Sequence, residues 1–467
     1  MDSKDHGLKK ELKLRDLVLM QVLLIVALNS VGYAARQGPS QVVLWLLAGL
    51  LFYVPLAVVV IRLSRAIPVE GGVYQWVKEG ISPFAGYMAA WSFTIYTVGY
   101  YSSISLQVTN GIAYTGGPDA AWLATSKPFA LGVTVAISLL ACAVNVLGLH
   151  CAKWFSGAAG VWTIATVAIL LYLLLRVGAV PHAHAHGSYS LSLAWPAFSL
   201  VTLNVFTKMA MFSLSGFDQC SIFAEECRKP KNDVARSVLV AAPMIAAMYI
   251  ICTCAVQAYV ADVDVAAPIS QTLQAGFGTA WLGRILTLLA GAGYNLVLIA
   301  GVVVAVGMVA RLPMAAGWDG LLPAWWSELH PRFRTPAKAI VAVSMCVLAM
   351  GILSIATSSN QEAVQALGAV GVGSYCITYL FLFSRVAFGM RSQAWRPGIW
   401  IRMGALAALL VALVSFVFQV VPVGDVSNPG VFAIKVTVAI LATNGLGAFL
   451  YWRGKQWAAR MIVASAG

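Results

Sequence analysis

The chain has 467 residues, of which 60% are hydrophobic and only 10% are charged, whereas about 25% of the residues of a soluble domain are charged. A soluble globule of this composition would lack the polar surface needed to cover its core, so an ordinary water-soluble fold is excluded. The formal net charge of +13 would suit a nucleic-acid partner, but the positions of the basic residues argue for another origin.

Long apolar runs alternate with short polar loops over nearly the whole chain. Runs of about 20 to 28 residues can cross a hydrocarbon core of roughly 30 Å, and they must be helical because backbone groups in lipid have to be paired within the segment. We therefore predict an all-α membrane protein. The twelve predicted spans are 16–35, 42–61, 84–110, 128–147, 152–176, 198–226, 234–260, 285–311, 337–357, 363–385, 400–420 and 430–452.

The basic residues favour one side of this predicted topology. With a cytoplasmic N-terminus, the cytoplasmic segments hold Lys9, Lys10, Lys13, Arg15, Arg62, Arg65, Arg228, Lys229, Lys231, Arg236, Arg332, Arg334, Lys338, Arg391, Arg396 and Arg402, among others. The opposite side keeps only Arg36, Lys127, Arg176, Arg284 and Lys435. This positive-inside bias predicts that both termini are cytoplasmic. The charge therefore reflects topology, and no nucleic-acid partner is expected.

The charged segment before residue 16 leads directly into a full-length span, so no cleavable signal peptide is expected. The eight cysteines lie nearly all inside or at the ends of apolar runs. Cys252 and Cys254, two positions apart, face different sides of a helix and do not form a zinc site. We expect free thiols that pack as small apolar groups, with no disulfide framework and no cofactor.

Small and polar residues interrupt two spans midway. They are Asn29–Gly32 in the first span and Ser213–Gly216 in the sixth. Interrupted spans in corresponding positions of two five-helix halves indicate an inverted-repeat transporter, because unwound backbone at membrane depth is tolerated where it lines a cavity. The half-helix N-termini would offer partial positive charge to a carboxylate. The alternative is that the small residues only permit close helix packing.

Two ionisable residues lie within the sixth span, where a charge is costly and marks a functional candidate. Asp218 follows the interruption on its cytoplasmic side. Burial penalises a charged carboxyl, so Asp218 is a candidate for proton coupling; the alternative is a cap on the inner half-helix. Lys208 lies one turn before Phe212, on the same face. It either snorkels towards the surface or faces the outer vestibule, attracting an anionic group or restraining Asp218.

Two polar segments outside the spans carry weaker signals. The outer segment 181–196 contains His182, His184 and His186, which would suit a metal ion but are more simply explained by a solvated loop; no metal site is predicted. The segment 311–336 combines tryptophans with polar residues, which predicts a short amphipathic helix on the cytoplasmic interface. Glu225 and Glu226 are expected to pair with the basic loop that follows them.

Three motifs in register resemble the amino acid–polyamine–organocation (APC) superfamily. The first runs from Phe212 through Gly216-Phe217-Asp218 to a Glu pair, Arg228-Lys229-Pro230 and Arg236-Ser237. The second is Pro68-Val69-Glu70-Gly71-Gly72-Val73-Tyr74, followed by Gly86 and Trp91. The third is Asp319-Gly320-Leu321-Leu322-Pro323 before Thr335-Pro336. Their order and spacing agree with the superfamily over nearly the whole chain, and the protein resembles an amino-acid permease.

The resemblance implies twelve transmembrane helices in the leucine-transporter-type arrangement, a 5+5 inverted repeat with broken first and sixth helices, which works by alternating access. Phe212 would be an aromatic gate, and Tyr96, Thr97 and Tyr101 would line the opposite wall, unless they only pack. The substrate-binding residues implied in this way are Asn29, Ser30, Val31, Gly32, Tyr96, Thr97, Tyr101, Phe212, Ser213, Leu214, Ser215 and Gly216. Relatives commonly have an acid at the position of Asp218.

Several features depart from the superfamily's patterns. The first interruption keeps only Gly32 where relatives have more glycine, and Val31 is stiff, so the carboxylate clamp is expected to differ. The stretch 299–310 in the eighth span lacks the hydroxyls that sodium-coupled members use, and the fifth span has no internal lysine, because Lys153 lies near its start. The loop 111–127 has no cysteine, so no disulfide-linked subunit is expected.

These observations predict a cytoplasmic tail (1–15), a first five-helix repeat (16–177), an extracellular loop (178–197), a second repeat (198–388), and two last helices with a cytoplasmic tail (389–467). We expect a sodium-independent amino-acid transporter, either a proton symporter or an exchanger, with its small-molecule substrate, protons and the lipid bilayer as partners. The predicted location is a bacterial cytoplasmic membrane. A polyamine or organic-amine carrier and a non-transporting sensor remain alternatives. No catalytic constellation is present, so an enzyme is not expected.

Overall fold

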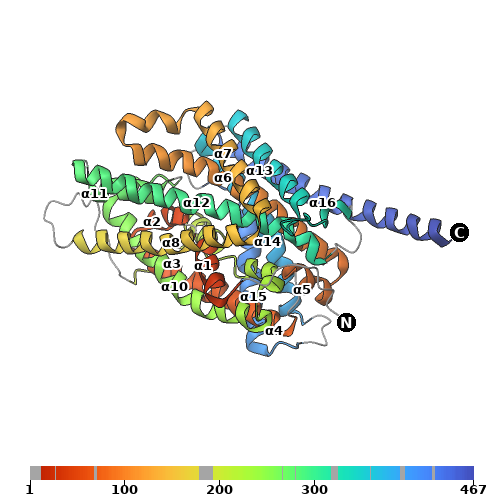
Figure 1. The fold of residues 1–467 in the computed structure, drawn as a ribbon. Coiled ribbons are helices and arrows are strands. Elements are labelled where there is room, and N and C mark those ends of the chain that lie inside the picture. Colours follow the sequence, from red (N-terminus) through yellow and green to blue (C-terminus); the bar gives the residue numbers. More distant parts are fainter. Residues whose placement is uncertain are drawn as a thin grey trace.

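In the computed structural model, all regular structure within the described residues is helical (Figure 1). The described residues are 12–26, 28–67, 71–177, 193–265, 267–278, 280–316, 324–357, 359–389, 395–422 and 426–466. Within them, nine helices are long and apolar enough to cross a membrane. The chain is therefore a multi-pass membrane protein.

The first half of the chain contains helices of very different lengths. They are α1 (Leu14–Ile25), η1 (Leu28–Ser30), α2 (Val31–Ala35), η2 (Gly38–Ser40), α3 (Gln41–Ala48), η3 (Gly49–Tyr53), α4 (Val54–Ala66), α5 (Val73–Gly80), α6 (Pro83–Gly116), η4 (Pro118–Ala124), α7 (Lys127–Leu147) and α8 (Leu149–Val177). The segments from η2 to α4 form one continuous apolar span over Gly38–Ala66.

The second half begins with another interrupted helix. Its elements are α9 (Leu200–Lys208), η5 (Met209–Ser213), η6 (Gln219–Glu226), α10 (Pro230–Tyr259), α11 (Pro268–Phe277), α12 (Trp281–Ala316), η8 (Ala324–Trp326), α13 (Ala337–Thr357), α14 (Asn360–Ala387), α15 (Ile399–Phe418) and α16 (Pro429–Ala466). In the predicted interfacial segment 311–336, residues up to Ala316 continue α12, and the described remainder has only the three-residue η8. The described remainder therefore has no helix longer than η8, and residues 317–323 of the predicted amphipathic helix lie outside the described residues.

Helix α6 lies in the core of the bundle. It packs against α14, α12, α13 and α5, and most of its side chains are buried, including serine and threonine hydroxyls. Several of these hydroxyls bond the carbonyl one turn earlier, as Thr97 does to Phe93, so they do not need water. In contrast, α7, α13, α15 and α16 carry large exposed apolar side chains such as Leu139, Leu353 and Leu410, which would face lipid.

The two interrupted helices lie inside this bundle, against α10, α12 and α14. Helix α16 extends beyond the other helices at the end of the bundle where α4 and α5 lie, and α11 lies at the opposite end (Figure 1). The predicted histidine loop, residues 182–186, lies outside the described residues. All eight cysteines are free. Five of them are buried as expected, whereas Cys142 is partly exposed and Cys151 and Cys346 are exposed.

Candidate functional site

The first interruption separates α1 from α2. Helix α1 ends at Ile25, and Val26 leaves the helical region with φ −75° and ψ 69°. The carbonyl oxygen of Ile25, which lacks a helical partner, accepts a hydrogen bond from the hydroxyl of Tyr249 at 2.5 Å. A freed backbone group in a membrane protein needs such a partner, so α10 stabilises the interruption.

The position of this interruption agrees with the prediction in part. The sequence predicted unwound backbone at Asn29–Gly32. Asn29 and Ser30 lie in a 3-10 turn between α1 and α2, whereas Val31 and Gly32 belong to α2. The interruption begins about one turn earlier than predicted, after Ile25. The side chain of Asn29 lies outside the described part of the structure.

The second interruption lies where the sequence predicted it. Helix α9 continues through the π-helical turn η5 and ends at Ser213, with Leu214 at φ −106° and ψ 10°. Gly216 has φ +121°, a conformation that side chains with a Cβ rarely adopt. Its backbone N–H, which has no helical acceptor, donates to the hydroxyl of Tyr379 at 2.9 Å.

The two interruptions contact each other in the interior of the bundle. The hydroxyl of Ser213 donates to the hydroxyl of Ser30 at 2.7 Å, and both side chains are buried. This hydrogen bond joins two segments 183 residues apart. Ser215 bonds the carbonyl of Met211 one turn earlier instead. The structure therefore brings together the Ser30 and Ser213 regions, as the sequence predicted.

Phe212 lies between the interrupted helices and the core of the bundle. Its ring contacts Tyr33 of α2 and Tyr100 of α6, with centroid distances of 6.0 Å and 6.2 Å, and it packs on Gly368 of α14. Neither Tyr33 nor Tyr100 was predicted. The signal for Tyr100 was its position four residues after Tyr96, on the same face of one helix.

The predicted residues on α6 have separate surroundings. The ring of Tyr96 stacks on Tyr375 of α14 with centroids 4.2 Å apart, and the hydroxyl of Thr97 bonds its own helix. Tyr100 and Tyr101 instead line a cavity of about 30 Å³ beside Val26. A cavity of this size has room for roughly one or two water molecules, so the interruptions are closely packed in this conformation.

Asp218 is buried below the second interruption, with 1% of its surface exposed. One carboxylate oxygen, Oδ1, accepts hydrogen bonds from the hydroxyls of Tyr375 at 2.8 Å and Tyr379 at 2.7 Å. The side chain does not cap η6, which removes the capping alternative in this conformation. Both tyrosines were missed by sequence reasoning. Their spacing of four residues within an apolar span, which places both hydroxyls on one face, was the available signal.

Lys208 is also buried, with 4% of its surface exposed. Its ammonium donates to the carbonyl oxygen of Phe418 at 3.1 Å and to Oε1 of Gln419 at 3.0 Å, at the end of α15, and it lies 5.7 Å from the centroid of Phe212. The side chain therefore does not snorkel to the surface, and its hydrogen bonds go to α15 and not to Asp218, which bonds tyrosines of α14. Its contact with Phe212 agrees with the predicted helical spacing.

A buried ion pair joins the interrupted helix to α12 at the predicted cytoplasmic end. Nε of Arg311 lies 2.9 Å from Oε1 of Glu226, and each side chain is 3% exposed. Glu226 therefore has a partner on α12 that the sequence did not predict, while its expected pairing with the basic loop that follows it stays a prediction. The backbone of Leu12 also bridges this segment, donating to the carbonyl of Glu226 and accepting from the N–H of Arg228. The side chain of Glu225 lies outside the part of the chain that the structure describes.

Two features that bear on the driving ion are the stretch 299–310 and the position of Lys153. Residues 299–310 belong to the uninterrupted helix α12 and are largely buried, and Lys153 lies near the start of α8, 3.4 Å from Asp16. Among the residues that the structure describes, no cluster of three or more His, Cys, Asp or Glu side chains has the geometry for a metal ion.

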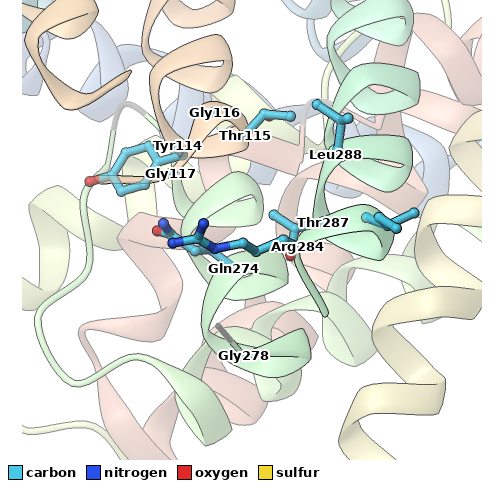
Figure 2. Close-up of a pocket in the computed structure, with 10 residues that line it drawn as sticks. Tyr114, Thr115, Gly116, Gly117, Gln274, Gly278, Arg284, Thr287 and Leu288 are labelled. Carbon is cyan, nitrogen blue, oxygen red and sulfur yellow. The ribbon is translucent and has the colours of Figure 1, made fainter. Parts of the chain in front are cut away.

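A separate pocket of about 220 Å³ lies at the opposite end of the bundle, between α6, α11 and α12. Figure 2 shows the guanidinium of Arg284 beside Gln274, with Tyr114 across the pocket. The hydroxyl of Tyr114 donates to Asp264 at 2.8 Å. The predicted site residues do not line this pocket. Helix α11 connects it to the first interruption, because its residue Pro268 packs on Gly32.

Comparison with known proteins gives a consistent result. A family described as amino acid permease matches residues 17–442. An uncharacterized transporter of Legionella pneumophila is 23% identical over 420 residues, 88% of each chain. The vacuolar cationic amino acid transporter 4 of Arabidopsis thaliana is 25% identical over 389 residues, 80% of this chain and 64% of that protein. A probable agmatine/putrescine antiporter of Lactococcus lactis is 23% identical over 247 residues, about half of each chain.

Proposed function

Because the chain belongs to the amino acid permease family of the APC superfamily, we propose that it is a secondary active transporter that carries amino acids by alternating access. It is a transporter and not an enzyme. The observation that carries the proposal is the meeting of two helix interruptions through Ser30 and Ser213 in the interior of the bundle. Freed backbone groups at this depth suit a ligand that carries both a carboxylate and an amine.

The proposed architecture has twelve spans, of which the first ten form two inverted five-helix repeats. The corresponding positions of the two interruptions, in α1–α2 and α9–η6, support this arrangement. We place both termini in the cytoplasm on the basis of the basic residues, and the protein in a bacterial cytoplasmic membrane. The match to an uncharacterized transporter of Legionella pneumophila supports the bacterial assignment.

In this proposal the substrate binds between Ser30–Gly32 and Ser213–Gly216. Phe212 covers it on one side, and Tyr100 and Tyr101 form the wall on α6. The small cavity beside Val26 enlarges when the helix halves separate, so substrate entry requires Phe212 to leave its contacts with Tyr33 and Tyr100. Amide N–H groups at the start of α2 hold the carboxylate, because the N-terminus of a helix carries partial positive charge.

Asp218 is the proposed proton-coupling residue. Its Oδ1 accepts two tyrosine hydrogen bonds, and one of these tyrosines, Tyr379, accepts from the backbone of Gly216. A proton added to the carboxylate removes its charge, and a neutral carboxyl is a weaker hydrogen-bond acceptor than a carboxylate, which weakens the bonds to Tyr375 and Tyr379. Protonation is thereby linked to the backbone of the second interruption. The absence of side-chain oxygens from 299–310 supports a sodium-independent mechanism.

Uptake into proteoliposomes tests this proposal. We expect saturable uptake of at least one amino acid, accelerated by an inward proton gradient, and at least ten-fold slower uptake by Asp218→Asn under the gradient. Asp119→Asn, at an exposed carboxyl of η4, is the matched control and should retain wild-type uptake. Uptake that needs only internal substrate and ignores the gradient would make the protein an exchanger and Asp218 a structural residue.

The second candidate is a carrier of polyamines or other organic amines. The similarity to a protein named as a probable agmatine/putrescine antiporter favours it. Agmatine and putrescine in the same uptake panel separate the two candidates. If neither an amino acid nor an amine is taken up, the remaining hypothesis is a membrane sensor that has the transporter fold but does not transport.

A further inference from the structure

Lys208 places a positive charge beside the proposed substrate site. The side chain is buried inside the bundle, one turn before Phe212 on the same helix. Its ammonium lies 5.7 Å from the centroid of the Phe212 ring. That ring contacts Tyr33 and Tyr100 and borders the second interruption. The charge and the proposed substrate therefore lie on neighbouring sides of one aromatic side chain.

The partners of this ammonium are neutral acceptors. They are the carbonyl oxygen of Phe418, the amide oxygen of Gln419 and the face of Phe212. Within the described residues Lys208 forms no ion pair. Asp218, the nearest acid in sequence, binds two tyrosines of α14. Dipoles stabilise a buried charge without cancelling its field, so the field of Lys208 extends into the site.

We infer that Lys208 sets the charge specificity of the transporter, so that its substrates are amino acids without a positively charged side chain. The inference rests on the proposed function and narrows its substrate class. The hydrogen bonds to the end of α15 hold the ammonium in place. It therefore acts on the substrate through its electric field and not as a direct ligand. A lysine-like or arginine-like substrate would bring a second cation next to it. Cationic amino acids, agmatine and putrescine, the substrates named for some relatives, are excluded on the same ground.

The size of the discrimination follows from Coulomb's law. A substrate cation in contact with the far face of the Phe212 ring would be about 9 Å from Nζ, and at an effective dielectric constant of about 20 it would bind roughly 20-fold more weakly than a neutral isostere. Methionine has a similar length and no charge, so Lys208→Met should remove most of this factor. Arginine retains the charge, so Lys208→Arg should retain the discrimination.

The test compares two pairs of isosteres in proteoliposome uptake: citrulline with arginine, and norleucine with lysine. For the wild type we expect uptake efficiency to be at least 10-fold higher for the neutral member of each pair. Lys208→Met should bring the ratio to within about three-fold of one, chiefly by raising uptake of the cation. Lys435→Met, at the ion pair with Glu362 near the start of α14, is the control and should leave the ratio unchanged.

Each outcome decides a separate point. Wild-type uptake of arginine, lysine, agmatine or putrescine that equals uptake of the neutral amino acids overturns the inference and leaves the transporter proposal intact. An unchanged ratio in Lys208→Met, with normal neutral uptake, also overturns it. If Lys208→Met does not fold, Lys208→Gln, which keeps a hydrogen-bond donor for Phe418, serves in its place, and the wild-type ratios alone still decide the specificity. No uptake of any amino acid by the wild type contradicts the proposed function instead.

Discussion

The buried pair of Arg311 and Glu226 should control access to the site from the predicted cytoplasmic side. Replacement by Arg311→Met leaves the Glu226 carboxylate buried beside an apolar side chain. Breaking a buried ion pair in this way costs about 3–5 kcal/mol, which corresponds to a factor of roughly 10² to 4 × 10³ in a conformational equilibrium. An open state present at about 0.1–10% in the wild type would rise to at least about 10%.

A native cysteine reports this opening. Cys227 follows Glu226 directly and is fully buried, whereas Cys151 is exposed. We expect a thiol reagent applied to detergent-solubilised protein to label Cys227 at least 10-fold faster in Arg311→Met than in the wild type, with equal labelling of Cys151. Peptide mass spectrometry resolves the two sites.

Two further variants test the reasoning behind this magnitude. Arg332→Met removes an exposed arginine on the same predicted side and should leave the labelling of Cys227 unchanged. Adding Glu226→Gln to Arg311→Met removes the carboxylate charge that has lost Arg311, and it should restore most of the protection because a buried neutral side chain costs far less than a buried charge. Wild-type labelling of Cys227 in a well-folded Arg311→Met protein would refute the proposed role of the pair.

Two other predictions concern the second interruption. Gly216→Ala should lower the thermal stability measured in detergent by an amount equivalent to about 1–3 kcal/mol, because φ is +121° and a Cβ would crowd its neighbours. Gly132→Ala is the control, because a Cβ there meets nothing within 4 Å, and it should leave the thermal stability unchanged. Equal effects of the two substitutions would contradict the argument. Tyr379→Phe should reduce uptake more than Tyr375→Phe, because Tyr379 bonds both Asp218 and the backbone of Gly216. Tyr375→Phe removes one bond to the carboxylate, worth about 1.5–3 kcal/mol, and a long contact of 3.5 Å with the side chain of Gln219, but no bond to the backbone. Equal rates for the two variants would count against the link through Gly216.

The positions of the interruptions show what the sequence can and cannot predict. Ser213–Gly216 was readable because small and polar residues stand out in an apolar span, and Gly216 supplies the positive φ that the turn requires. The end of α1 was not readable, because Ile25 and Val26 continue an apolar run. The helix can end there because the hydroxyl of Tyr249, 224 residues away in sequence, donates a hydrogen bond to the carbonyl oxygen of Ile25.

The ionisable residues also show which features the sequence can predict and which depend on the packing of distant helices. Composition and depth identified Asp218 and Lys208 as exceptional, since a charge inside a span is costly. Their partners depend on which helices pack together, and nothing local to the sixth span indicates Tyr379 of α14 or Gln419 at the end of α15. For Glu226, the sequence did not indicate Arg311, which α12 brings to it from 85 residues away.

The backbone pairing of Leu12 with Glu226 and Arg228 has a practical consequence for handling the protein. Leu12 is attached to the inner half of the interrupted helix, an element that moves in the alternating-access cycle we propose. A bulky fluorescent or affinity domain fused just ahead of Leu12 would load that element directly and should slow turnover. The same domain placed after α16, which extends away from the other helices (Figure 1), should leave turnover unchanged.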